Sequence, residues 1–212
     1  MAIITPAQLK AEIYANCGFN LDTDVTQTDI VPDTTIGYHI TSAQAAIERY
    51  LHTKLEPTAV TETLYGTNDV HLILSNIPVI SPITSLTIDD TSITTSEVYV
   101  NEDRGMLILK DNAEESSFKN TKNYPLIEVT YNYGYATGEC PQEYKNLVVM
   151  LASIMTLATQ TGGTFDDPST ISLPSFSYSI GQAYVNIKGA IDNMLVSYKE
   201  MLKSVKPKPQ VA

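Results

Sequence analysis

The segment that most constrains the fold of this chain is residues 127–155, which read IEVTYNYGYATGECPQEYKNLVVMLASIM. Its first seven residues alternate between apolar or aromatic side chains and polar ones, and this period of two predicts a strand that is buried on one face. Gly134 and Gly138 then let the backbone turn, and Pro141 suits the first turn of a helix. The segment therefore predicts a strand, a glycine corner and a helix in direct succession.

Four segments predict helices. Thr5 and Pro6 suit the cap and the first residue of a helix over 6–16. Apolar residues at intervals of three and four predict three longer helices, over 34–55, 141–160 and 180–203. We expect Asp33 to cap the second helix.

The predicted helix over 141–160 has more apolar surface than one core-facing stripe requires. We expect its main stripe, which includes Leu151, to lie in the core. Val149, Met150 and Leu157 widen the apolar surface beyond that stripe. Because a helix that is apolar on most sides must be covered on most sides, these three residues are our candidates for a subunit interface.

Between the second and third helices the pattern changes to short β-branched runs separated by Gly, Pro and Asp. This spacing predicts about six antiparallel strands. The fold class is therefore α+β, a bundle of about four helices with an inserted antiparallel β module. We expect loops over 17–33, 112–124 and 159–179. The expected domains are the N-terminal helices (1–60), the β module (61–134), the C-terminal helices (135–203) and a flexible basic tail (204–212).

The net charge of −11 argues against a protein that wraps nucleic acid, because neutralising phosphates requires clustered Lys and Arg. DNA could still pass close by, since an acidic wall repels it. The N-terminus lacks a signal-peptide pattern, and no run reaches the ~18 apolar residues of a membrane span. We therefore expect a soluble chain of intracellular origin without a membrane segment.

The residues that could carry chemistry favour structural roles. The three histidines, His39, His52 and His71, form no metal-binding spacing, so we expect no zinc site and no cofactor. The acidic pairs at 89–90 and 166–167 lie in turn sequences, where Asp bonds nearby backbone N–H groups. Asp22, Asp24 and Asp29 leave weak calcium binding open.

The sequence gives little support to a nucleophilic role for Cys140. Its position near a helix N-terminus could lower the pKa of the thiol, but no candidate base lies beside it in sequence. No nucleophile elbow or phosphate-binding loop occurs either. The sequence predicts a protein that is not an enzyme.

The C-terminal tail, KSVKPKPQVA, contains Lys203, Lys206 and Lys208. It could be a fraying terminus, as many domains have. It could equally be an arm that orders on an acidic partner ring.

The order of these segments resembles the head–tail connector proteins (head-completion or adaptor proteins) of long-tailed bacteriophages. The likeness lies in AAIERYLHTKL (45–55), TETLYG (61–66), IPVISPITSLTIDD (77–90), VYVNEDRGMLIL (98–109), EVTYNYGYATGECPQEYKNLVVMLAS (128–153) and SFSYSIG (175–181). The corner from the strand through Gly134 and Tyr135 to Pro141 is the most recognisable of these landmarks.

The resemblance implies a structural virion protein of the neck, made in the host cytoplasm. It implies a homo-oligomeric ring, usually a dodecamer, between the portal protein and a tail-completion or neck protein. DNA would pass through its channel without sequence-specific binding. Lys203, Lys206 and Lys208 would then be candidates for docking on the portal.

A second hypothesis is a β-rich module without catalytic activity that binds a carbohydrate or peptide. It would use Tyr131, Tyr133 and Tyr135 as stacking faces. Strand alternation argues against it, because it places Tyr131 and Tyr133 on the same, buried side.

Overall fold

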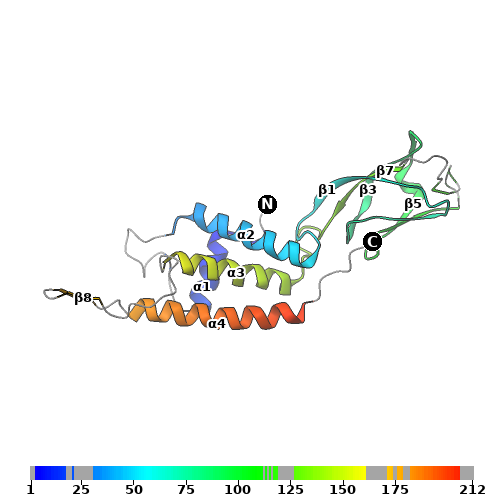
Figure 1. The fold of residues 1–212 in the computed structure, drawn as a ribbon. Coiled ribbons are helices and arrows are strands. Elements are labelled where there is room, and N and C mark those ends of the chain that lie inside the picture. The colour runs from blue at the N-terminus through cyan, green and yellow to red at the C-terminus, as the bar shows by residue number, and fades with distance from the viewer. Residues whose placement is uncertain are drawn as a thin grey trace. The chain divides into compact units, whose positions relative to one another are not determined.

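The computed structural model describes residues 3–17, 21, 31–111, 113, 115, 117–118, 127–160, 171–173, 176–178 and 182–205. These residues form four helices and antiparallel sheets, which confirms the α+β class (Figure 1). They divide into a helical unit, within Met1–Ile47 and Pro141–Lys206, and a β unit, within Glu48–Cys140. The chain thus passes between units after Ile47 and after Cys140, where the sequence analysis places the boundaries after 60 and 134.

The helical unit contains the predicted helices at nearly the predicted positions. They are α1 (Pro6–Cys17), α2 (Asp33–Leu51), α3 (Gln142–Gln160) and α4 (Gln182–Ser204). Within this unit α3 lies between α2 and α4, and α1 crosses them (Figure 1). The core consists of side chains that are at most 9% exposed: Leu9, Ile13, Ile36, Ile40, Ala43, Ile47, Leu147, Val148, Ala152, Ile154, Leu157, Ile191, Met194 and Val205. No helix in the described ranges is long and apolar enough to span a membrane.

The start of α1 follows the predicted capping pattern. The Thr5 hydroxyl accepts a hydrogen bond from the Gln8 backbone N–H at 3.3 Å, and the Gln8 side chain accepts one from the Thr5 N–H at 2.8 Å. This reciprocal pair satisfies two N–H groups that a helix start leaves unpaired. Asp33 is the first residue of α2, and it forms an ion pair with Lys10 of α1 at 2.8 Å.

The end of α2 lies four residues before the predicted one. His52 has a positive φ of 54°, and the Thr53 N–H donates to the Glu48 carbonyl at 3.2 Å, as in a Schellman motif. The Glu48 carboxylate then accepts hydrogen bonds from the Lys54 ammonium at 2.7 Å and from the Leu55 N–H at 3.2 Å. The sequence reading missed this end because His52 takes the position at which glycine is the usual signal.

The described part of the β unit contains two antiparallel sheets. The strand order is β1-β7-β3-β4 in the larger sheet and β2-β6-β5 in the smaller one. The strands are β1 (Thr58–Leu64), β2 (His71–Ile73), β3 (Val79–Ile88), β4 (Thr91–Ile93), β5 (Val98–Asn101), β6 (Met106–Leu109) and β7 (Ile127–Tyr133).

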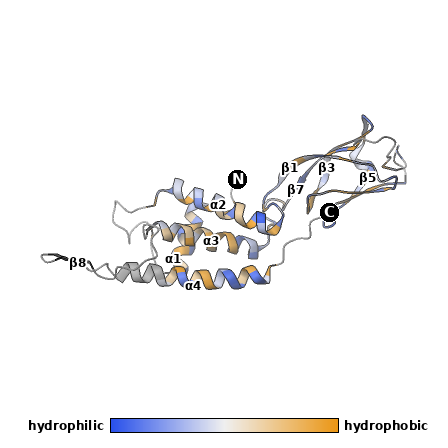
Figure 2. Ribbon diagram, viewed as in Figure 1, coloured by the Kyte–Doolittle hydropathy of each residue, from blue (hydrophilic) through white to orange (hydrophobic). Residues whose placement is uncertain are grey.

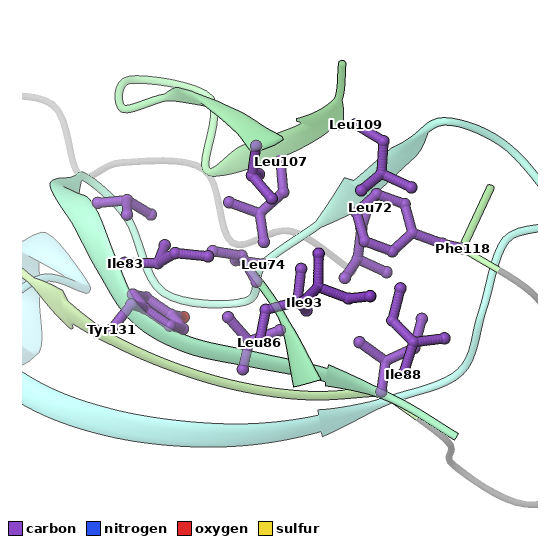
Figure 3. Close-up of a cluster of buried hydrophobic side chains, with 14 residues drawn as sticks. Leu72, Leu74, Ile83, Leu86, Ile88, Ile93, Leu107, Leu109, Phe118 and Tyr131 are labelled. Carbon is purple, nitrogen blue, oxygen red and sulfur yellow. The ribbon is translucent and has the colours of Figure 1, made fainter. Parts of the chain in front are cut away.

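A single hydrophobic cluster fills the space between these sheets (Figure 3). It is made by Leu72, Leu74, Val79, Ile83, Leu86, Ile88, Ile93, Val98, Leu107, Leu109, Phe118, Ile127, Val129 and Tyr131. Phe118 is a correction to the predicted protruding loop over 112–124, most of which lies outside the described residues. Its side chain is fully buried, and its N–H donates to the Asp69 carbonyl at 2.8 Å.

The described part of the β unit contains seven strands, one more than the six predicted. The additional strand, β4, pairs with β3 through a two-residue turn in which Asp89 and Asp90 both have positive φ. This confirms the turn interpretation of that acidic pair. Pro82 lies inside β3 rather than between strands, where the register with β7 shifts between Ile80 and Ser85.

The segment over 159–179, predicted as a loop, contains a small antiparallel pair. Its strands are β8 (Ile171–Leu173) and β9 (Phe176–Tyr178). The second acidic pair, residues 166–167, lies outside the described residues, as do Asp22, Asp24 and Asp29.

The glycine corner after β7 has a steric cause. Gly134 has a φ of 105°, and a Cβ at this position would lie 2.5 Å from the Glu56 carbonyl oxygen and 2.8 Å from that of Lys54. Its N–H donates to the Pro78 carbonyl at 2.9 Å. Gly138 also has a positive φ, of 90°, but space for a Cβ is open there. The corner therefore needs glycine at 134 both for backbone conformation and for close approach.

Candidate subunit interface

A groove of about 360 Å³ lies in the helical unit between α1, α3 and α4. It is lined by Glu12 and Asn16 of α1, by Asn146, Val149, Met150 and Ser153 of α3, and by Ala190, Asn193, Met194, Ser197 and Met201 of α4. Two of the three residues that the sequence nominates for an interface, Val149 and Met150, therefore line one recess.

The helical repeat explains why these residues come together. The α3 residues lie at i, i+3, i+4 and i+7, and those of α4 add i+11 to the same pattern. Residues at this spacing share one face of a helix. The groove is thus formed where one face of α3 and one face of α4 approach α1.

The lining combines flexible apolar groups with uncharged polar ones. Met150, Met194 and Met201 are three of the six methionines in the chain, and methionine adapts readily to the shape of a partner. Asn16, Asn146, Asn193 and Ser197 are exposed and can hydrogen-bond, whereas Glu12 is the one charged residue of the lining. Such a surface suits a protein partner, since interface centres are depleted of charge.

Two of the polar groups are held in place by their own helices. The Asn16 amide donates to the Glu12 carbonyl at 2.9 Å. The Asn146 side-chain oxygen accepts a hydrogen bond from the Gln142 amide at 2.8 Å, and no hydrogen bond of its side-chain NH2 group is found in the described part of the chain. Asn146 can therefore donate to a group that enters the groove.

The remaining interface candidates lie elsewhere. Leu157 is fully buried inside the helical unit, so it has no surface to offer a neighbour, and we retain only Val149 and Met150. Leu151, which we expected in the core, is only half-buried. The fully buried α3 side chains of that region are instead Leu147 and Val148. Figure 2 shows how hydrophobic α3 is over much of its length.

Of the portal-docking candidates, the structure describes only Lys203. It lies in the last turn of α4, is exposed, and pairs with Glu200 at 2.8 Å. Lys206 and Lys208 lie outside the described residues.

Sequence reasoning missed most of the α4 side of the groove. The sequence predicts a helix over 180–203, but it singles out neither Met194 nor Met201 for an interface. The available signal was the repeat of small or amide side chains at Ala190, Asn193 and Ser197, interleaved with these methionines.

The β unit holds a partly buried polar cluster around Tyr131. The Tyr131 hydroxyl donates to Glu62 Oε1 at 2.6 Å and accepts from the Asn76 N–H at 3.3 Å. Glu62 also accepts hydrogen bonds from the Asn76 amide and, at 3.0 Å, from the Ser75 N–H. Burial, assisted by the hydrogen bond to Glu62, raises the pKa of Tyr131 far above its usual value, so the hydroxyl stays protonated.

The burial of Tyr131 argues against the carbohydrate- or peptide-binding hypothesis, which would use Tyr131, Tyr133 and Tyr135 as stacking faces. Tyr131 is fully buried, so its ring cannot stack on a ligand, and Tyr133 and Tyr135 are half-buried. The Tyr131 side chain instead joins β7 to β1 and to the residues that follow β2.

The histidines have separate structural positions. His39 Nδ1 lies 3.1 Å from the Thr156 hydroxyl, and burial lowers its pKa. His52 closes α2, and His71 lies 3.4 Å from Asp69. Among the residues that the structure describes, no three His, Cys, Asp or Glu side chains are grouped to hold a metal ion. Cys140 is buried.

The described residues form a helical unit that is interrupted in sequence by an inserted β module. The sequence matches the family model described as head completion protein over residues 23–156, well over half of the 212 residues. The chain belongs to the head completion protein family. This membership confirms the resemblance noted in the sequence. No curated protein matches the chain.

Two solved structures are similar in fold. One is a chain in the virion of a native gene transfer agent (GTA) particle, with a TM-score of 0.58. The other is a chain in the neck of an empty GTA particle, computed with C6 symmetry, with a TM-score of 0.55. Each is 13% identical to this chain, and each alignment covers 99% of this chain and 92% of the other. At this identity the likeness concerns the fold alone.

Proposed function

We propose that this head completion protein is a ring subunit in the neck of a tailed phage or a phage-like particle. The ring joins the portal vertex to the tail and surrounds the passage for DNA. The protein acts by sealing and aligning the two structures, and the proposal includes no catalytic step. The observation that carries it is the groove between α1, α3 and α4 in a member of this family.

The groove supports assembly because its lining includes apolar side chains that are only partly covered within one chain. Val149 and Met150 are half-buried, and both lie on the groove face of α3. A ring subunit needs two different contact surfaces, one for each neighbour. The chain of similar fold in the GTA neck belongs to a structure computed with C6 symmetry, and this symmetry is compatible with the ring of twelve that we expect.

The charge of the chain supports a passage that does not retain DNA. A net charge of −11 repels phosphate groups, so DNA can move through such a ring without being held. We assign the basic tail, with Lys203, Lys206 and Lys208, to docking on the portal, and the opposite side of the ring to a tail-completion or neck protein.

The test is assembly with the portal of the same particle, measured by native mass spectrometry and electron microscopy. We expect rings with the wild-type chain. Val149→Asp and Met150→Asp should each prevent ring formation, because a carboxylate would be buried without a partner at the subunit contact. Both variants should retain the wild-type circular dichroism spectrum.

Val196→Asp is the matched control. It makes the same change at an α4 residue that is 63% exposed and does not line the groove, so rings should still form. Loss of rings in Val196→Asp but not in Val149→Asp would show that the interface lies on the outer face of α4 instead. If the wild-type chain associates with neither portal nor tail proteins, the proposed function is wrong.

A further inference from the structure

The groove identifies one of the two surfaces that a ring contact requires, and the exposed side chains of the same unit identify the other. In the described part of the helical unit, the large hydrophobic side chains with high exposure are Tyr14 (58%), Tyr38 (74%) and Val196 (63%). Tyr14 and Val196 belong to α1 and α4, which line the groove themselves. Tyr38 belongs to α2, which contributes no residue to it.

Tyr38 lies in a stripe of small, uncharged side chains. Thr34, Tyr38, Thr41 and Ala45 are exposed and recur at three and four, so they share the outer face of α2. Ser42, beside them, is exposed as well. We call Thr34, Tyr38, Thr41, Ser42 and Ala45 the α2 stripe. Tyr38 projects beyond its small neighbours, and these neighbours would allow another helix to pack closely against α2.

The α2 stripe and the groove match in chemistry. The stripe carries no charge, and the groove carries only that of Glu12, so contact would bury few charged groups. The groove methionines offer sulfur to an aromatic ring, a favourable contact, and its amides can bond the tyrosine hydroxyl. A cavity of about 360 Å³ is within the range of pockets that hold small organic groups.

The two surfaces also have the arrangement that a closing ring needs. Figure 1 shows α2 and α4 on opposite sides of α3 within the helical unit. A heterologous contact joins two different patches of one subunit, and repeating it around an axis closes a ring.

Resting on the proposed function, we infer that the groove between α1, α3 and α4 receives the α2 stripe of the adjacent copy, with Tyr38 inserted among the methionines. The occupant of the groove is therefore a second copy of this chain, and Tyr38 is the anchor of the subunit contact. Large aromatic side chains in a central recess are the usual anchors of protein interfaces.

Cysteine cross-linking in the assembled ring tests this contact. Thr41→Cys and Ser197→Cys place one thiol on each surface while Tyr38 stays in place, and both original side chains are exposed. Under mild oxidation the double variant should give a ladder of covalent oligomers, because every subunit bonds to both neighbours. A mixture of the two single variants should stop at dimers that contain one copy of each. Each single variant alone reports the background from Cys17 and Cys140.

A substitution series gives an independent measurement. Tyr38→Asp should abolish rings, whereas the matched Tyr65→Asp, at a tyrosine of the β unit that is 56% exposed, should leave them intact. Rings that form but give no ladder, or that tolerate Tyr38→Asp, would overturn this contact and leave the proposed function standing. Dimers from Thr41→Cys alone would mean that α2 faces α2, which also overturns it. Absence of rings in the wild-type chain would refute the proposed function itself, and this contact with it.

Discussion

At the scale of single residues, the Tyr131 hydroxyl shows how a β sandwich tolerates a carboxylate on a core-facing position. Glu62 lies opposite Val129 in the register of β1 and β7, so its side chain points to the same face as the hydrophobic cluster. Tyr131, Asn76 and the Ser75 N–H together supply its hydrogen bonds. An inward carboxylate on an edge strand also discourages pairing with further strands.

Tyr131→Phe should lower the free energy of unfolding by about 1–3 kcal/mol, because the variant leaves a half-buried carboxylate short of a donor. The wild-type stability should also fall above pH about 10, by about 1.4 kcal/mol per pH unit for one proton. The reason is that this tyrosine ionises in the unfolded chain at its ordinary pKa but resists ionisation in the fold.

Urea unfolding between pH 7 and 11 measures both effects of Tyr131→Phe. The part of the alkaline slope due to this residue should be missing from the variant. Tyr133→Phe is the control, since no hydrogen bond of its hydroxyl contributes to the cluster. Equal losses in the two variants would show that ring packing, rather than the hydroxyl, is what matters.

At the scale of elements, the corner between β7 and α3 depends on glycine for two separable reasons. Gly134→Ala should destabilise the chain both through its positive φ, by about 1–2 kcal/mol, and through overlap with two carbonyl oxygens, by about 1–3 kcal/mol more. Gly138 also has a positive φ, but an added Cβ there would have no atom within 4 Å. Gly138→Ala should therefore show only the destabilisation that the positive φ causes.

Thermal unfolding of both glycine variants gives the comparison, and the difference between them measures the steric part. If Gly138→Ala is as damaging as Gly134→Ala, the close approach to residues 54 and 56 contributes nothing.

The elements that sequence reasoning located well are those with a clear local signal. The three longer helices follow from a period of 3.6, α1 follows from its capping residues, and six of the strands follow from β-branched runs between turn residues. The errors arise where contacts between distant segments or unusual turn residues determine the local structure. His52 ends α2 in the position that glycine usually takes, and β4 forms through an Asp-Asp turn. Phe118 is buried in the core although the residues around it in sequence are polar.

The groove itself could be predicted only in part. The surplus of apolar residues on α3 singled out Val149 and Met150, because periodicity shows which residues share a face. It could not show that Leu157 is covered by the chain's own helices, or that Met194 and Met201 approach from α4. Those facts depend on how helices distant in sequence pack.

At the scale of the whole molecule, the C-terminal tail offers a test of docking that is independent of the ring contact. Val205 is only 5% exposed, and its N–H donates to the Met201 carbonyl at 3.2 Å, so it belongs to the folded helical unit. Truncation after Val205 should therefore leave the unfolding free energy unchanged and weaken binding to the portal. Removing Val205 as well should cost about 1.5–3 kcal/mol.

Measuring portal affinity at two salt concentrations shows whether the C-terminal tail binds the portal through its charges or does not take part in docking. The combined Lys203→Ala, Lys206→Ala and Lys208→Ala variant should bind the portal more weakly than wild type at low salt, with the difference shrinking at high salt. Unchanged affinity in both the truncation and this variant would remove the tail from the docking proposal.

The contact of Gly134 with residues 54 and 56 means that the first and last segments of the β unit meet each other. A unit whose two ends touch can be exchanged or deleted as a cassette, because a short linker would rejoin the chain on either side. Homologues could therefore evolve very different β inserts while keeping one helical unit. The same geometry makes this corner a convenient place to graft a foreign domain onto the helical unit.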